Sequence, residues 1–513
     1  MNRFAVAVVL ALCAVLPARA LAVDVLTYHN DNLRSGWNSA ETTLTPKSVA
    51  AGMKALFARD LDGVEYGQPL VATAEPTAKG TRDLVIVATD NDTISAYDAH
   101  DGTVIWTRSL VPVGETVVKP QFTGCINMLH AGVSGTPVID RARDAVYVVA
   151  ESLTRAGAQQ HITFRLYSVA LGTGRNRSAA VAIHGAAGFA GRIHFLADYQ
   201  QQRTALVLAN NRVYVGFGST CDFNGNYYHG WLFAYDPDSL KQLGTFMDSP
   251  TPDRHGNFMG GIWMSGNGAA VDAHGNLLLI TGNGSFDGRY NFGDSLVKLA
   301  PDLSSVIDYF TPYTVKSDND GDSDFGSGGL LLFPDVAGQP SVGFGQGKDG
   351  ILTMVDQHQL GHFHAGGPDH ALAELTLGST WASPAYFAGP EDEFIFTTGG
   401  PLYAVQVSRN PARMRVISRS SETFPINNGN GETPSVSSNG RDRSSAIVWI
   451  VSWQSDRTLH LFAYSAFNLA QPIFQSQLGP WRFEQTNSVQ VPTIANGTVY
   501  VAGYRQLFAF VLK

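Results

Sequence analysis

One unit of short strands repeats along almost the whole chain. Its clearest copy, LVIVATDNDTISAYDAHDGTVIW, runs from Leu84 to Trp106, with turns at Asp90–Asp92 and at Asp101–Gly102. Short apolar or alternating runs that end at Gly, Asn or Asp are typical of antiparallel strands joined by tight turns. Repetition of such a unit predicts a ring of blades, in which each copy buries its apolar faces against its neighbours.

Eight copies can be counted from Gly67 onwards, at spacings of roughly 50–70 residues. The last copy stops at Lys513 after three strands and lacks an outer strand. The strand-like segment Ala55–Leu61 (ALFARDL) precedes the first copy and has no blade of its own. We therefore expect it to complete the last blade and close the ring, which removes exposed sheet edges. The prediction is an all-β, eight-bladed propeller, with seven blades as the alternative.

The domain organisation follows from this count. Residues 1–22 combine Arg3, an apolar run from Phe4 to Leu16 and a small-residue site, which is the pattern of a secretory signal peptide cleaved after Ala22. Residues 23–54 are expected to be an irregular lead-in, and residues 55–513 a single propeller domain. No later stretch is long and apolar enough to span a membrane, so we expect a periplasmic or secreted protein.

The net charge limits the classes of partner that the chain can bind, and the cysteines indicate a disulfide. Loss of Arg3 and Arg19 with the signal peptide takes the formal net charge from −9 to −11. An acidic chain argues against nucleic acid and suits a basic soluble partner such as a cytochrome. Cys125 and Cys221 remain, and in an oxidising compartment we expect them to pair, with two free thiols as the alternative. No C-x-x-C-H motif attaches a haem to this chain.

The repeats resemble those of the quinoprotein dehydrogenases that use pyrroloquinoline quinone (PQQ). Phrases such as ISAYDAHDGTVIW and LFAYDPDSL carry the likeness, and the opening TYHNDNLRSGWNSAETTLTP is similar to an exported bacterial group of such propellers. The resemblance implies the propeller fold. It does not by itself imply catalysis, since non-catalytic assembly propellers share the repeat.

Local motifs extend the resemblance to four residues. The segment from Trp263 to Leu299 holds a Trp, a T-G-N turn and a G-D pair, which implies that Trp263 stacks on the quinone and that Asn283 binds calcium. SDNDGDSDFGSGG implies that Asp324 is the base that takes a hydroxyl proton, next to the metal. GKDGILTMVD implies that Lys348 contacts the quinone oxygens, where a cation favours the reduced cofactor.

Each of these residues also has a structural interpretation. Asn283 lies between two glycines, where Asn is often a left-handed turn residue. Trp263 could fill the core, Asp324 could belong to a solvated acidic loop, and Lys348 could be exposed in a hairpin. Five histidines could suggest a metal: His229, His255, His358, His362 and His364. For the pair His362 and His364, which follows Gly361, we expect a surface loop instead.

The chain also departs from the family pattern. The adjacent Cys-Cys pair is missing, and the calcium-binding Glu is not found near Gly225, although Asp222 could replace it. Three functions therefore stay open. The first is a PQQ- and calcium-dependent dehydrogenase that oxidises an alcohol or sugar and passes electrons to a separate carrier. The second is a non-catalytic binding or assembly module, and the third is a polysaccharide hydrolase or lyase that uses paired carboxylates.

Overall fold

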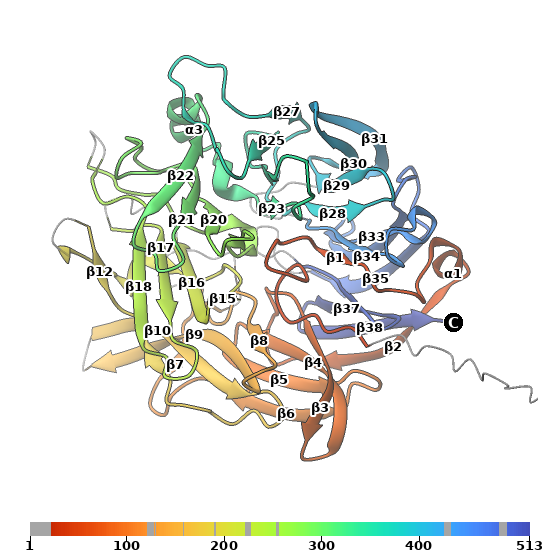
Figure 1. Ribbon diagram of the computed structural model, residues 1–513. Helices are drawn as coiled ribbons and strands as arrows, with labels where there is room; N and C mark the ends of the chain where they lie inside the picture. Colours follow the sequence, from red (N-terminus) through yellow and green to blue (C-terminus); the bar gives the residue numbers. More distant parts are fainter. Residues whose placement is uncertain are drawn as a thin grey trace, which may run out of the picture.

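Eight sheets of four or five strands, antiparallel except where β1 and β26 are added, surround one axis in the computed structural model (Figure 1). It describes residues 22–120, 128, 130–156, 159–188, 191–220, 227–252, 256–424, 432–481 and 490–513. The expected eight-bladed propeller is confirmed, and the seven-bladed alternative is wrong. The signal peptide up to residue 21, Cys125 and Cys221 lie outside the described residues, so signal peptide and disulfide stay predictions.

The first four blades follow one another along the chain, each with its first strand innermost. Blade one is β3 (Leu70–Thr77), β4 (Gly80–Thr89), β5 (Thr93–Asp98) and β6 (Val104–Ser109). Blade two is β8 (Val138–Asp140), β9 (Ala145–Ala156), β10 (Gln159–Ala170) and β11 (Val181–Ala182), with β7 (Thr116–Val117) added to β9. Blade three is β15 (Val207–Ala209), β16 (Arg212–Ser219), β17 (Trp231–Tyr235) and β18 (Gln242–Met247), with β14 (Gln200–Gln201). Blade four is β19 (Ala270–Val271), β20 (Leu277–Ile280), β21 (Leu296–Leu299) and β22 (Val306–Thr311), with β26 (His362–Phe363).

The other four blades complete the circle. Blade five is β23 (Leu330–Leu332), β24 (Val342–Gly345), β25 (Ile351–Asp356) and β27 (Ala373–Thr376). Blade six is β28 (Ala385–Ala388), β29 (Glu393–Thr398), β30 (Pro401–Arg409) and β31 (Ala412–Thr423). Blade seven is β32 (Ser435–Ser437), β33 (Ile447–Trp453), β34 (Thr458–Ser465) and β35 (Phe474–Pro480), with β1 (Trp37–Asn38). Blade eight is β36 (Thr493–Ala495), β37 (Thr498–Gly503), β38 (Gln506–Leu512) and β2 (Met53–Asp60).

The ring is closed by the N-terminal strand, as the sequence predicts. Strand β2 pairs antiparallel with β38, from Met53 opposite Leu512 to Asp60 opposite Gln506. The N-terminal strand β2 and the last three strands of the chain thus share blade eight, and Phe57 of β2 packs in the core. The strand expected at Ala55–Leu61 is therefore real, although it begins at Met53.

The residues before β2 wind once around the axis and bond to all eight inner strands. The order of these bonds along the segment is the order of the blades. In blades one to four the partners are Val25 with Val71, Leu26 with Ile139, Asn32 with Leu208, and Asn32 with Val271. In blades five to eight they are Leu33 with Leu332, Ser35 with Tyr386, Gly36 with Val436, and Asn38 with Ile494. The N-terminal segment therefore lies along the inner strands around the axis of the ring.

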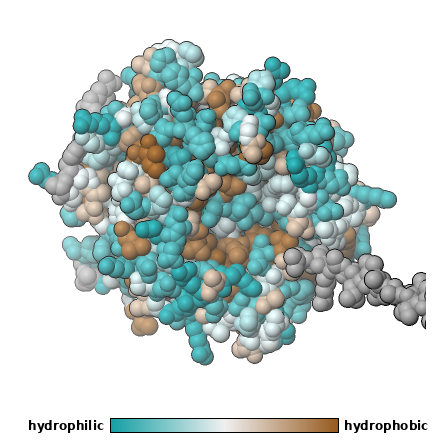
Figure 2. Space-filling view, viewed as in Figure 1, coloured by the Kyte–Doolittle hydropathy of each residue, from teal (hydrophilic) through white to brown (hydrophobic). Residues whose placement is uncertain are grey.

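Short helices complete the described structure. They are α1 (Pro46–Ala50), α3 (Val315–Gly321) and the 3-10 turns Ala197–Tyr199, Met264–Gly266, Phe325–Ser327 and Arg443–Ser445, with β12 (Ala186–Ala187) and β13 (Ile193–His194) as a small separate hairpin. Across the described residues, no helix has the length and apolar character needed to cross a membrane. Figure 2 shows one face of the ring, mostly hydrophilic at its margin, with apolar residues gathered toward the middle.

Candidate functional site

The four residues singled out by the sequence lie together between blades four and five. Trp263 precedes β19, Asn283 follows β20, Asp324 precedes β23 and Lys348 follows β24. The Lys348 Nζ bonds to the Asp324 carboxylate, and the Asn283 backbone N–H donates to Asp324 Oδ1 at 2.9 Å. Connections between blades and turns within blades meet at the same end of a propeller, which is why residues far apart in sequence can converge.

Asp322 extends this cluster. Its Oδ1 accepts from Lys348 Nζ at 3.0 Å and from Asn283 Nδ2 at 2.9 Å. The side chain of Asp324 is 7% exposed, so Asp324 is not part of a solvated loop, whereas Asp322 is exposed. The side chain of Lys348 is only 15% exposed and is held by both carboxylates.

Asn283 is not in the left-handed region of backbone space, so the structure does not support the turn interpretation. Its side-chain nitrogen is bonded to Asp322, but its Oδ1 is buried and has no hydrogen-bond partner. A buried amide oxygen without a donor is costly, and such an atom commonly marks the place of a bound ion or water. The amide therefore offers an oxygen ligand in the middle of the cluster.

Two cations approach the indole of Trp263. The Arg203 guanidinium carbon lies 4.5 Å from the ring centroid, and Lys348 Nζ lies 5.9 Å from it. Lys348 Nζ is also 5.9 Å from the ring centroid of Trp381, which precedes β28. Indole faces attract cations through the ring quadrupole. This part of the site thus combines two aromatic faces with two positive charges.

Gly282 allows the indole of Trp263 and the carboxylate of Asp324 to approach each other. A Cβ at this position would lie 2.8 Å from Asp324 Oδ1 and 2.8 Å from Trp263 Nε1, both too close for real atoms. Only glycine therefore fits between the two side chains. The Gly-Asn-Gly turn that suggested a simple bend in the sequence is needed here for close packing.

The electrostatics of the site depend on burial. Burial would lower the pKa of Lys348, but the carboxylates of Asp324 and Asp322 outweigh this effect and hold that pKa above its usual value. Burial, followed by the charge of Asp324, raises the pKa of Asp294 well above its ordinary range. Burial also raises the pKa of Asp349, the neighbour of Lys348 in the chain, to about 7.

Sequence reasoning missed several residues of the site. Asp294 is the second member of the G-D pair, and Asp322 belongs to the acidic run, yet neither received a role. Trp381 and Arg203 precede the inner strands of blades six and three, as Trp263 does in blade four. Their equivalent places in the repeat were the signal that could have found them.

The other sequence candidates lie elsewhere. His362 is exposed and pairs with Asp308 at 3.0 Å, while His229 is buried against Ser249. His255, Asp222 and Gly225 lie outside the described residues. Within the parts of the chain that the structure describes, no three His, Cys, Asp or Glu side chains form a metal-binding group by themselves. A cation at the candidate site would therefore depend on the amide oxygen of Asn283.

The residues present fit the two groups that the resemblance implies. The unpartnered Asn283 Oδ1 beside the Asp324 carboxylate offers oxygen ligands, which suit a hard cation such as Ca²⁺. The indole of Trp263, with Lys348 near it, suits a planar anion such as a carboxylated quinone. The observation that decides the fit is the buried, unsatisfied oxygen at the centre of the cluster.

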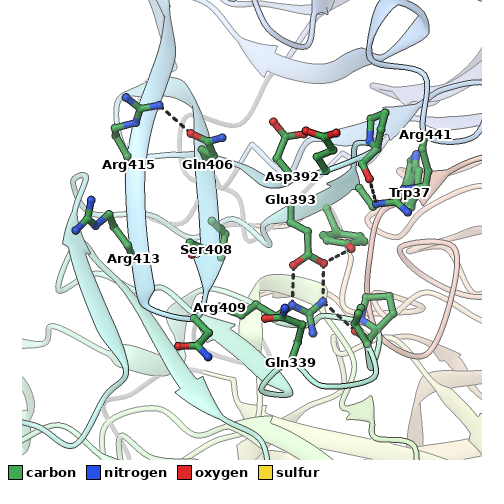
Figure 3. A pocket seen from close by; sticks show the side chains of 18 residues that line it. Trp37, Gln339, Asp392, Glu393, Gln406, Ser408, Arg409, Arg413, Arg415 and Arg441 are labelled. Atoms are coloured by element: carbon green, nitrogen blue, oxygen red, sulfur yellow. Dashed lines mark hydrogen bonds and ion pairs between the residues drawn. The ribbon is translucent and has the colours of Figure 1, made fainter.

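Two pockets lie outside this cluster. One, of about 730 Å³, adjoins the Asn283 turn between the β20–β21 connection and α3. The other, of about 800 Å³, lies between blades five and six among the β28–β29 and β30–β31 turns, at the opposite end of the ring. Figure 3 shows that Arg409 in this second pocket points at Glu393, with which it forms two hydrogen bonds. Arg409 also bonds to Pro334 and Pro340 carbonyls, so it anchors the β23–β24 loop.

Comparisons with known proteins identify the fold. No family model and no curated protein matches the sequence. Among solved structures, quinohemoprotein alcohol dehydrogenase from Comamonas testosteroni has a TM-score of 0.62 at 14% identity, covering 95% of this chain and 80% of the other. A europium-containing methanol dehydrogenase has a TM-score of 0.60 at 11% identity, covering 95% and 98%. The chain shares their fold. At these identities the likeness extends to the propeller and not to the reaction.

Buried carboxyl groups elsewhere in the ring make stability depend on pH. Burial raises the pKa of Glu432 to about 8 and that of Asp248 to about 7, and raises the pKa of Glu65 well above its usual range. Below these folded pKa values the groups are protonated in the folded chain, and they ionise more easily when it unfolds. Their stabilising contribution is therefore full below the ordinary carboxyl pKa and is lost as pH rises through the folded values.

We accordingly expect the melting temperature to fall between about pH 5 and about pH 9. Differential scanning calorimetry across this range measures the slope. In Glu432→Gln, which keeps a hydrogen-bonding oxygen for Ser452 but cannot ionise, the slope should be smaller. A melting temperature that rises across the range would contradict this assignment.

Proposed function

We propose that this chain is an exported, PQQ-dependent dehydrogenase that oxidises the hydroxyl group of an alcohol or sugar. The observation that supports it most is the convergence of Asp324, Lys348, Asn283 and Trp263 at one end of the ring. The resemblance gives each of these residues a role, and their contacts are compatible with those roles.

Asp324 is the proposed base. Its carboxylate is buried and accepts a hydrogen bond from the Asn283 N–H. It also forms an ion pair with the ammonium of Lys348, which stabilises the ionised form that accepts a proton. The substrate hydroxyl would donate its proton to this carboxylate. PQQ, when bound, supplies the acceptor for the hydride that leaves the same carbon.

Lys348 and Trp263 are the proposed quinone contacts. The indole provides a flat face, and the ammonium, fixed by Asp322 and Asp324, provides a positive charge near it. A positive charge next to the quinone oxygens favours the reduced state. Asn283 and Asp324 are the proposed calcium ligands.

The pocket beside the Asn283 turn provides room for a substrate larger than a simple alcohol. Its volume of about 730 Å³ lies in the range of small-molecule sites. Its lining includes the hydroxyl and amide side chains of Thr251, Ser285, Asn291 and Asn319. Groups of this kind bind hydroxyls, which supports a sugar as substrate. A separate carrier, such as a cytochrome, would take the electrons outside the cytoplasm.

The proposal is tested by titrating the purified protein with PQQ in the presence of Ca²⁺. We expect saturable changes in quinone absorbance at micromolar concentration, and a weaker response in Trp263→Ala. Trp453→Ala is a matched control, because Trp453 is another partly buried indole, at the end of β33 in blade seven. Absence of saturable binding to the unmodified protein would rule out the dehydrogenase.

The second candidate function is a propeller that binds a partner without chemistry. One observation favours it: the guanidinium of Arg203 already occupies a position 4.5 Å from the Trp263 ring, where a quinone would compete with it. Failure of the PQQ titration, together with capture of an envelope component by the intact protein, would support this function instead.

A further inference from the structure

We propose that Asp294 is the second carboxylate of a cation site formed with Asn283 and Asp324, in place of the glutamate that the sequence lacks. The inference deepens the proposed function and rests on it for its role in chemistry. Asp294 lies two residues before β21, in the same blade as Asn283. No sequence argument assigned it a role.

Asp294 is tied to both other residues. Its backbone N–H donates to the Gly282 carbonyl at 2.9 Å, and the N–H of the same peptide unit, that of Asn283, donates to Asp324 Oδ1 at 2.9 Å. Its side-chain Oδ1 accepts from the Phe325 N–H at 3.1 Å. Asp294 therefore contacts the peptide that carries Asn283 and the one that follows Asp324, which places its carboxyl group beside both.

Two oxygen atoms of this network lack a partner. Asp294 is fully buried, and its Oδ2 has no hydrogen-bond donor; the same holds for Oδ1 of Asn283, a residue that is 7% exposed. Leaving two such acceptors unsatisfied within one small network is costly, and a bound cation would satisfy both. The carbonyl-type and carboxylate oxygens present are the ligands that Ca²⁺ prefers.

The charge of the cluster agrees with a divalent ion. Asp294, Asp322 and Asp324 bring three carboxyl groups to the cluster, and the ion pairs of Lys348 are with Asp322 and Asp324. A divalent cation would compensate the carboxyl group of Asp294 as well. Burial of an uncompensated carboxylate is unfavourable, and a bound cation would compensate the buried carboxylate of Asp294.

The experiment uses Tb³⁺ as a luminescent substitute for Ca²⁺ on the full-length protein after treatment with EDTA. Because the indole nitrogen of Trp263 and Asp324 Oδ1 both border Gly282, excitation of tryptophan should sensitise Tb³⁺ emission. We expect saturable emission that Ca²⁺ reverses by competition. Asp294→Asn, which keeps an oxygen for the Phe325 N–H, should weaken Tb³⁺ binding at least tenfold.

Asp320→Asn is the matched control, because Asp320 lies in the same acidic run but is exposed and paired with Lys316. It should bind Tb³⁺ like the unmodified protein. If Asp294→Asn does not fold, Asn283→Leu tests the same site. Calorimetric titration of the unmodified protein with Ca²⁺ measures binding without any variant.

The outcomes separate this inference from the proposed function. No saturable Tb³⁺ emission and no Ca²⁺ binding in the unmodified protein would overturn the cation site, and so would equal affinity in Asp294→Asn. Cation binding without PQQ binding would support the cation site and contradict the proposed dehydrogenase function. If the protein binds no cation and EDTA does not affect its binding of PQQ, the cation site would be contradicted while the proposed dehydrogenase function would stand.

Discussion

Arg34→Met should lower the free energy of unfolding by about 3–5 kcal/mol. Arg34 is fully buried in the N-terminal segment that lies along the inner strands. Its Nε donates to the Ala269 carbonyl at 3.1 Å, and its Nη1 donates to Thr27 Oγ1 and to the Tyr28 carbonyl, both at 2.9 Å. The variant removes these donors and leaves their acceptors buried without partners. Denaturant unfolding followed by tryptophan fluorescence measures the change.

Arg413→Met is the matched control for this prediction. Arg413 lies on the outer strand β31 and is exposed, so the same substitution should change the free energy of unfolding by no more than about 0.5 kcal/mol. Equal losses in the two variants would mean that the buried Arg34 contributes no more to the free energy of unfolding than an exposed arginine does. A loss confined to Arg34→Met would identify the segment as part of the folded core.

The ring itself could be predicted from the sequence because each blade repeats the same short-range pattern. Turns such as Asp101–Gly102 and strands such as Thr498–Gly503 carry their own local signals, and the closing strand was found because one strand was missing at the end. The N-terminal segment could not be predicted in the same way. Its eight bonds to the inner strands are mostly made by backbone atoms, which leave no pattern in the side chains.

The candidate site could be predicted only where a motif preserved it. Asn283, Asp324 and Lys348 were found through short phrases that resemble the family, and the structure brings them into hydrogen-bond contact. Arg203 and Trp381 meet them from blades three and six, and only their places before an inner strand, like that of Trp263, could have indicated this contact. The arrangement of the blades around the ring brings these residues together, and the spacing of the repeats in the sequence does not specify that arrangement in detail.

Close backbone packing explains why the sequence did not indicate Asp294. In the chain it is eleven positions from Asn283, and nothing in that spacing indicates that Asp294 bonds to the peptide unit between Gly282 and Asn283. A Cβ at Gly293 would clash with Gly284, and a Cβ at Gly282 would clash with Asp324 and Trp263, so the glycines allow the backbone to pack closely here. Close backbone packing, rather than the identity of the acid, therefore brings this carboxyl group to the site.

Asp324→Asn should lower kcat/KM for the oxidation of the preferred alcohol or sugar by about 100- to 10,000-fold. The amide keeps the size of the side chain and an oxygen that can accept from the Asn283 N–H, but it cannot take a proton from the substrate hydroxyl. Affinity for PQQ should change much less, because the indole of Trp263 and the ammonium of Lys348 remain. Dye-linked assays of the PQQ-loaded protein and parallel PQQ titrations measure the two quantities.

Asp322→Asn distinguishes the base from its neighbour. Asp322 contacts the same ammonium and the same Asn283 side chain, but it is exposed, and only a weak effect on turnover is expected from it. A comparable loss of activity in both variants would mean that the carboxylates act only by holding Lys348. A large loss in Asp324→Asn alone, with PQQ still bound, would assign proton removal to Asp324, because both variants weaken the contact with Lys348 and only one removes the buried base.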